Sequence, residues 1–261
     1  MISPAEDHPG MTEDVTQAHY GRLAATYDQN WAYSPGFITW MSGRIQDRLN
    51  TGAGDLAADI GCGTGLFARG LAAHAAAVAC ADPSPAMLGR LPDDARLIPV
   101  QATAQDLAAG RAALPHGRYD AILLKEALHH VPGDARPAVI AGLARLLRPR
   151  GRLLIVMLPA RISYPLFPEA LELFERRQPD PASVAELMRA AGLDAELTYD
   201  SFPLAFEVSR YLQMVRDRYM SLLAEFTDTQ IEAGITRIRR DHPGQQITFT
   251  DTFAFILGTM P

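Results

Sequence analysis

Short apolar runs alternate along most of the chain with stretches of helical spacing. The apolar runs predict strands at residues 56–60, 77–82, 96–102, 119–125 and 152–158. The segments between them, such as PAVIAGLARLLR, repeat apolar residues every three or four positions and predict helices. Apolar strands separated by helices are typical of parallel strands that are buried on both faces. We therefore expect an α/β fold with an open, doubly wound sheet.

Both ends of the chain depart from this alternation. Residues 13–50 have apolar and aromatic positions at helical intervals, broken by Ser-Pro-Gly, which predicts an amino-terminal helical cap. Two longer strands are expected at 195–207 and 247–260, with a helical insert at about 205–243. Within the insert, TDTQ predicts a capping box that opens its second helix. Because the insert lacks a core of its own, we expect a lid on a single domain spanning 1–261, near the ligand edge of the sheet.

A glycine-rich turn follows the first strand of the sheet. The segment ADIGCGTG places Gly61, Gly63 and Gly65 where the chain must turn sharply and where a ligand can approach the backbone amides. A dinucleotide fingerprint requires its third glycine at position 66, which is Leu66 here. The spacing argues against NAD or FAD, and the absence of GK[ST] argues against a nucleoside triphosphate.

An acidic residue ends the second strand. Asp82 lies about 20 residues beyond the glycine turn, where a carboxylate in a doubly wound sheet accepts hydrogen bonds from ribose hydroxyls. A glycine turn together with this acid describes a nucleoside ligand with a small polar tail. S-adenosylmethionine fits that description.

Four motifs resemble those of the class I S-adenosylmethionine-dependent methyltransferases, small-molecule type. They are DIGCGTG, ADPSPAML, QATAQDL and YDAILLKEALHHV, in the family's order and spacing. The resemblance implies a Rossmann-like, seven-stranded sheet of order 3-2-1-4-5-7-6 with the last strand antiparallel. It also implies S-adenosylmethionine as cofactor and S-adenosylhomocysteine as product.

The resemblance further implies which residues hold the cofactor. In chain order the cofactor candidates are Tyr20, Tyr27, Asp59, Gly61, Gly63, Asp82, Pro83, Met87, Ala104 and Gln105. For the two tyrosines the alternative is packing within the lid. For Asp59 it is a helix cap or a buried hydrogen bond, and for Met87 it is packing in the core. Thr103 stands where the family often has an acid, so adenine recognition there is expected to be weaker or to use the backbone.

Candidate catalytic residues follow the fourth strand. Methyl transfer from a sulfonium needs alignment, and it needs a general base only when the nucleophile carries a proton of high pKa. His129 or Glu126 is a candidate base, and Lys125, the sole lysine among 24 basic residues, is a candidate compact donor. The alternatives are that the histidine pair opens the next helix and that Lys125 pairs with Glu126. The Asn/Asp-Pro-Pro-aromatic motif of nucleobase methylators is absent, which disfavours nucleobase amines as acceptors.

Contact with the acceptor is expected from three further residues. They are His130 beside the fourth strand, and Arg216 and Tyr219 in the insert. For Arg216 the favoured alternative is the solvated face of a lid.

Composition narrows the classes of partner and compartment. The chain has 24 Lys and Arg against 30 Asp and Glu, a net charge of −6, so no broad basic surface for nucleic acid or an anionic membrane is expected. We find no apolar run of about 18 residues and no leader pattern, and Cys62 and Cys80 lack metal-ligand spacing. The expectation is a cytoplasmic enzyme without a metal, of open oligomeric state.

The sequence thus predicts methyl transfer to the O, N or C nucleophile of a small molecule, such as a specialised metabolite. The alternative is a protein of the same fold that binds S-adenosylmethionine and catalyses a non-methylating reaction such as a cyclisation.

Overall fold

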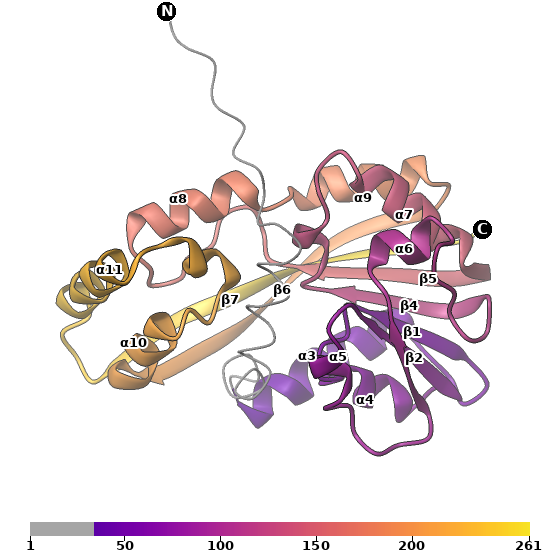
Figure 1. The fold of residues 1–261 in the computed structure, drawn as a ribbon, viewed down its shortest axis with the longest axis horizontal. Coiled ribbons are helices and arrows are strands. Elements are labelled where there is room, and N and C mark those ends of the chain that lie inside the picture. The colour runs from indigo at the N-terminus through magenta and orange to yellow at the C-terminus, as the bar shows by residue number, and fades with distance from the viewer. Residues whose placement is uncertain (1–33) are drawn as a thin grey trace, which may run out of the picture.

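A single seven-stranded sheet organises the protein (Figure 1). The computed structural model describes residues 34–261, so Tyr20, Tyr27 and the first part of the predicted cap lie outside the described residues. The strands are β1 (Leu56–Ile60), β2 (Ala77–Asp82), β3 (Leu97–Gln101), β4 (Tyr119–Lys125), β5 (Leu147–Met157), β6 (Asp194–Glu207) and β7 (Gln246–Thr259). Their order is β3-β2-β1-β4-β5-β7-β6, as predicted.

Strand direction also agrees with the expectation. β1 to β5 are mutually parallel, whereas β7 runs antiparallel to both β5 and β6. β1, β2 and β4 begin and end at the predicted residues. β5 begins earlier than predicted, at Leu147, and its register with β4 shifts between Tyr119 and Ala121. Pro149 and Gly151 lie in this irregular stretch, which is why the apolar pattern alone did not reveal it.

The helices cover both faces of the sheet (Figure 1). They are α3 (Pro35–Leu49), α4 (Ala68–Ala72), α5 (Pro85–Leu88), α6 (Ala104–Ala108), α7 (Arg136–Arg145), α8 (Pro168–Arg177), α9 (Pro181–Ala190), α10 (Val208–Arg216) and α11 (Asp228–Asp241), with short 3-10 turns η1 (Leu128–His130) and η2 (Ser221–Glu225). α3 and α4 share a buried cluster with Ala57 and Leu123, while α6, α7 and α9 share one with Ala58 and Ile122. Successive strand residues thus face opposite layers, as a doubly wound sheet requires.

The helix α3 shows how local sequence sets an element. The Ser34 hydroxyl accepts a hydrogen bond from the Phe37 backbone N–H at 3.1 Å, and Pro35 occupies the first turn. Met41 and Ile45 follow Phe37 at intervals of four and are buried. Asn50, in the left-handed conformation with φ 44°, ends the helix. The predicted break at Ser-Pro-Gly is therefore the start of this helix.

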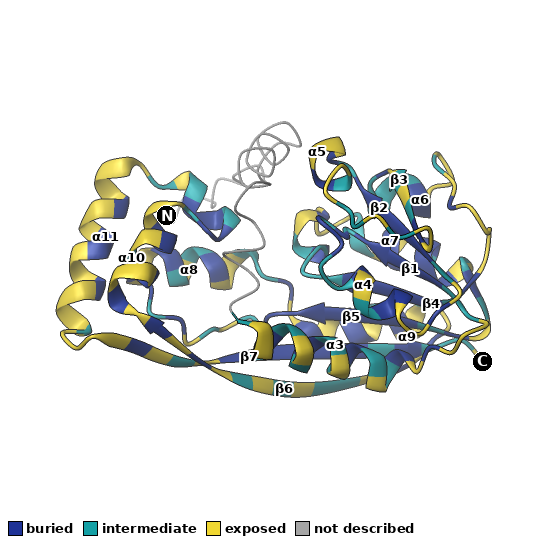
Figure 2. Ribbon diagram, turned by 90° about the horizontal axis from the view of Figure 1, so that it is seen from below, coloured by how far each residue is buried: buried dark blue, intermediate teal, exposed yellow. Residues whose placement is uncertain are grey.

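A helical lobe surrounds a projecting part of the sheet (Figures 1 and 2). β7 pairs with β6 along its whole length but with β5 only from Ala254 to Thr259, so the outer halves of β6 and β7 extend beyond the other strands. α8, α10, η2 and α11 pack around this projection and form what we call the helical lobe. The predicted capping box is present, with Thr227 and Gln230 bonded reciprocally at the start of α11. α8 was not predicted.

Within residues 34–261, none of the helices combines the length and apolar character needed to cross a membrane.

Candidate active site

A cavity of about 480 Å³ lies between the carboxyl edge of the sheet and the helical lobe. One side, the sheet wall, comprises Asp59, Gly61, Cys62, Gly63, Thr64, Leu66, Phe67, Lys125, Glu126, His129, His130, Val131, Pro132, Gly133 and Arg136. The other side, the helical wall, comprises Phe174, Arg177, Gln178, Met220, Ser221 and Leu222. Leu158, just beyond β5, also lines the cavity. The structure therefore brings the glycine turn and the end of β4 to one site.

The glycine turn is held in a conformation that suits glycine. Gly61, Gly63 and Gly65 have φ values of 75°, 55° and 78°, in the left-handed region. A Cβ on Gly61 would lie 2.6 Å from the Cβ of Ala127, so a side chain there would collide with the segment after β4. The close approach of these two segments forms the base of the sheet wall.

Asp82 fixes the turn from the end of β2. Its carboxylate accepts one hydrogen bond from the Gly63 N–H at 2.9 Å and another from the Ser84 N–H at 2.8 Å. Burial raises the pKa of Asp82, and these two backbone donors oppose the rise. Each carboxylate oxygen keeps a further acceptor position, so the group can still receive hydroxyl donors from a ligand.

Lys125 lies within a cluster of carboxyl groups at the tip of β4. Its Nζ is 4.7 Å from the ring centroid of Phe67, and Glu126, Asp251 and Asp59 all act on its charge. Burial lowers the pKa of Lys125, and the three carboxylates oppose this. Burial raises the pKa of Asp59 to about 7, with Lys125 lowering it and Asp82 raising it further. A compact cation thus stabilises acids that would otherwise be costly to bury.

Glu126 has two features that mark functional sites. Its φ is 50°, a conformation that costs energy for a residue with a side chain. Its Oε1 is buried and has no hydrogen-bond partner among the described residues. Burial raises the pKa of Glu126 to about 7, while Lys125 and the backbone N–H of Leu158 lower it. A carboxyl group in this state can accept or release a proton near neutral pH.

The histidine pair forms the 3-10 turn η1. The ring centroids of His129 and His130 are 4.0 Å apart. The pKa of His129 lies well below its usual range, because of burial first and then the positive charges of His130, Arg136 and Lys125. His129 is therefore neutral at pH 7 and can act as a hydrogen-bond partner beside Glu126.

The helical wall has a different character. Phe174, Met220 and Leu222 present apolar surface. The Arg177 guanidinium is paired with Glu225, with Nη2 2.7 Å from Oε2, which joins α8 to η2. Gln178 donates from Nε2 to the Leu158 carbonyl at 2.7 Å and so connects this wall to the end of β5.

The family model "Methyltransferase domain" matches residues 57–151, from β1 into β5 and including the whole sheet wall. Together with the relative described next and the strand order of the sheet, this match supports a class I S-adenosylmethionine-dependent methyltransferase. This methyltransferase is similar to the ubiquinone biosynthesis O-methyltransferase of Marinobacter nauticus, at 28% identity over 199 residues that cover 66% of this chain and 81% of the relative.

Solved structures share the fold of this methyltransferase. Phosphoethanolamine N-methyltransferase 2 of Haemonchus contortus, in complex with S-adenosyl-L-methionine, has a TM-score of 0.63 at 16% identity, with 99% of this chain and 61% of that one covered. The YcgJ protein of Bacillus subtilis has a TM-score of 0.58 at 19% identity, with coverage of 85% and 97%. At these sequence identities, both similarities show a shared fold alone.

The predicted cofactor residues lie along one edge of the sheet. Asp59, Gly61 and Gly63 line the cavity, and Asp82 holds the turn from beside it. The predicted adenine residues Pro83, Met87, Ala104 and Gln105 follow β2 and β3 and are not among the residues that line the cavity. Met87 is buried. Thr103 accepts a hydrogen bond from the Asp106 N–H at 3.0 Å, so it serves as the cap of α6.

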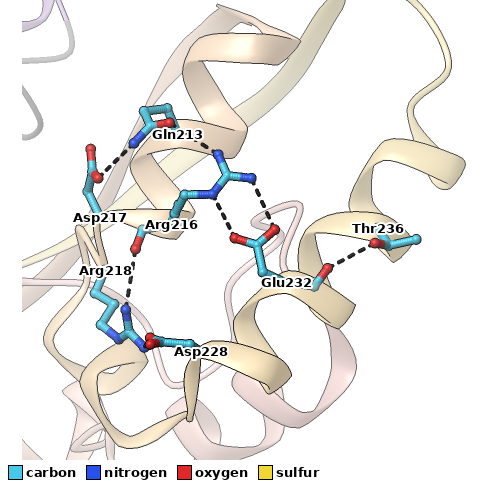
Figure 3. A network of polar contacts seen from close by, with 7 residues as sticks. All are labelled: Gln213, Arg216, Asp217, Arg218, Asp228, Glu232 and Thr236. Atoms are coloured by element: carbon cyan, nitrogen blue, oxygen red, sulfur yellow. Dashed lines mark hydrogen bonds and ion pairs between the residues drawn. The ribbon is translucent and has the colours of Figure 1, made fainter.

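The other predicted residues divide into two groups. Lys125, Glu126, His129 and His130 all line the cavity. Arg216 and Tyr219 do not. Figure 3 shows the Arg216 guanidinium directed at Glu232 of α11, to which Nε donates at 2.7 Å, on the exposed face of the lobe. The Tyr219 hydroxyl is buried 3.2 Å from that of Tyr211.

Several cavity residues were not predicted from the sequence, among them those of α8. Signals for this helix were present: Pro168 in the first turn, Glu169 near the start, and Arg176 and Arg177 in the last turn. A search for helix boundaries between the fifth strand and α9 would have found it. Arg136 had no comparable signal, because it resembles the many surface arginines of the chain.

Proposed function

We propose that this methyltransferase methylates a hydroxyl oxygen of a small, partly apolar molecule, such as a specialised metabolite with a phenol or enol group. The observation that carries the proposal is the Glu126 carboxyl group. The residue lines the cavity, its Oε1 is buried without a hydrogen-bond partner among the described residues, and burial raises its pKa to about 7. An oxygen acceptor needs its proton removed as the new bond forms, and in this proposal the Glu126 carboxylate removes it.

The remaining sheet-wall residues have distinct tasks in this proposal. Asp59, Gly61 and Gly63 would hold the methionine part of the cofactor, and Asp82 would accept hydrogen bonds from its ribose. When bound, S-adenosylmethionine supplies an electrophilic methyl group. Glu126 would take the proton from the acceptor hydroxyl as the methyl group passes from sulfur to oxygen, which leaves S-adenosylhomocysteine. Lys125 keeps the pKa of Glu126 from rising further, so that part of the population is ionised at neutral pH.

The helical wall supports an acceptor with apolar surface. Phe174 and Leu222 are 7% and 8% exposed, and they face the polar sheet wall across the cavity. Their contact with the acceptor would also exclude water from the reacting groups. The named relative from Marinobacter nauticus is an O-methyltransferase, which agrees with an oxygen acceptor.

A labelled-methyl assay tests the proposal. The full chain is given S-adenosylmethionine with a labelled methyl group and a panel of small phenols and enols, each with its amine counterpart. We expect label on oxygen, with kcat rising with pH through about 7 because Glu126 must be ionised. Glu126→Gln should lower kcat by about 10²- to 10⁴-fold and leave cofactor affinity unchanged.

The matched control is Glu186→Gln on α9, an exposed carboxylate paired with Arg189. It should match the wild type in kcat. Transfer to the amines in preference to the hydroxyls, or a Glu126→Gln variant with full activity, would contradict the proposal. Acceptor turnover without movement of label would favour a non-methylating reaction.

A further inference from the structure

Arg136 is a cavity-lining cation that the proposed chemistry does not use. It is the first residue of α7, half-buried, and its Nε donates to the Val131 carbonyl at 3.0 Å. This bond fixes the Nε end of the guanidinium, and the two terminal nitrogens take no part in it. Within residues 34–261, no carboxylate forms an ion pair with Arg136. Burial lowers its pKa, and no neighbouring acid opposes this.

Arg177 shows the contrasting case on the opposite wall. It too lines the cavity, but both of its terminal nitrogens contact the carboxylate of Glu225. Its charge is therefore neutralised by the protein, whereas that of Arg136 is not. A half-buried guanidinium without a counter-ion is partly desolvated, and an anion supplied by a ligand would compensate that cost.

The surroundings of Arg136 favour an anion over a neutral group. Val131, Pro132 and Gly133 line the cavity before it and carry no charge. Asp134, two residues before Arg136, does not line the cavity, and within residues 34–261 it forms no ion pair with Arg136. His129 lies near enough for the positive charge of Arg136 to lower its pKa. A cation next to a neutral imidazole and beside uncharged cavity-lining residues forms a positive subsite, separated in sequence from the acidic cluster of Asp59 and Glu126.

We propose that Arg136 binds an oxyanion carried by the methyl acceptor, so that the substrate class is a hydroxyl compound with a carboxylate or phosphate group. The inference rests on the proposed function, because it places the acceptor in this cavity. The planar guanidinium fork suits two parallel hydrogen bonds to such a group. With the anion held at Arg136 and the hydroxyl at Glu126, the acceptor would be fixed at two points.

Three small probes test the proposal on the full chain saturated with S-adenosylhomocysteine. Benzoate and phenyl phosphate carry the anion, and benzamide is the neutral counterpart of benzoate. Titrations followed by ligand-observed NMR should show at least one anion binding about tenfold or more tightly than benzamide. The tighter of the two anions identifies the oxyanion. Arg136→Gln should abolish the preference, and the exposed neighbour of Arg177, Arg176→Gln, should retain it.

Other outcomes would overturn the proposal. One is equal binding of all three probes by the wild type, and another is a preference that survives in Arg136→Gln. A third is a parallel loss of S-adenosylhomocysteine affinity, measured by calorimetry, which would assign Arg136 to the cofactor carboxylate. If Arg136→Gln does not fold, Arg136→Lys replaces it: the charge remains without the planar fork, so the preference should shrink but persist.

The same titrations separate this inference from the proposed function. Glu126→Gln should keep the anion preference because Arg136 is intact. If labelled methyl never reaches oxygen while the preference depends on Arg136, the proposed chemistry fails and the anion site stands.

Discussion

The two walls of the cavity are held in place by different kinds of interaction. The sheet wall consists of strand ends and a turn whose backbone is fixed by Asp82 and by the close contact of Gly61 with Ala127. The helical wall is carried on the projecting halves of β6 and β7 and is joined to the rest through side chains, among them Gln178. The first wall therefore has little freedom to move, and the second depends on contacts that are easier to change.

This difference matches the division of labour expected of a methyltransferase. The methyl donor must be placed within a fraction of an ångström of the nucleophile, which requires a rigid frame. Acceptors differ between enzymes of one fold, and their contacts can be supplied by inserted helices. Substitutions in the sheet wall should thus change cofactor affinity and the rate of methyl transfer. Substitutions on the outer face of the lobe should change neither.

The largest effect is expected from Asp82→Ala. The change removes the acceptor for the Gly63 and Ser84 N–H groups and the proposed partner of the ribose. Loss of hydrogen bonds to a charged group should weaken S-adenosylmethionine binding by about 100-fold. Isothermal titration calorimetry gives the dissociation constant directly.

Asp82→Asn serves as the control for shape. It retains one carbonyl oxygen for the turn and should lose less affinity than the alanine variant. Unchanged cofactor affinity in Asp82→Ala would show that the sheet wall does not hold the nucleoside.

A smaller effect, with a pH signature, is expected from Lys125→Met. Lys125 lowers the pKa of Glu126, so its removal should move that pKa above about 7. Because the ionised carboxylate is the active base, the rise of kcat with pH should move to higher pH, and kcat at pH 7 should fall by about five- to tenfold. The measurement is a pH profile of kcat.

Stability separates a functional Lys125 from a structural one. An acid whose pKa is raised by folding, as for Glu126 and Asp59, contributes stability at low pH and loses it as pH rises through about 7. Removal of Lys125 extends that loss to higher pH, so Tm should fall more at pH 8 than at pH 5. Lys125→Arg keeps the charge and should restore much of the kcat profile. A variant that loses only Tm, with an unchanged profile, would make Lys125 part of the scaffold.

The sequence predicted the sheet wall far better than the helical wall, for a physical reason. The turn of Gly61 and Gly63 and the acid Asp82 act through backbone geometry close to their own positions, so their spacing along the chain carries the information. Strand order followed from the family's motifs, and the buried strands followed from their apolar runs.

The helical wall depends on contacts that sequence spacing does not encode. Phe174 and Leu222 meet in one cavity because α8 packs against η2. The sequences of these two segments do not indicate that the two side chains lie in the same cavity. The state of Glu126 was equally hidden, since its positive φ and unpartnered oxygen arise from the chain path after β4. Arg216 shows the opposite case. Its position beside an apolar stripe suggested contact with the acceptor, but its side chain points away from the site.

The smallest effect is expected from Arg216→Ala, on the outer face of the lobe. Arg216 pairs with Glu232 across α10 and α11, and both side chains are largely exposed to solvent. Exposed ion pairs contribute little to stability, so Tm should change by no more than about 2 °C. Because the guanidinium is directed at α11 and does not line the cavity, the KM for the acceptor should stay at the wild-type value (Figure 3). Steady-state kinetics with the acceptor identified by the labelled-methyl assay provides the check. A several-fold rise in KM would show that the lobe turns Arg216 toward the acceptor during catalysis. The outer face of the lobe could then no longer be distinguished from the inner wall that contacts the substrate.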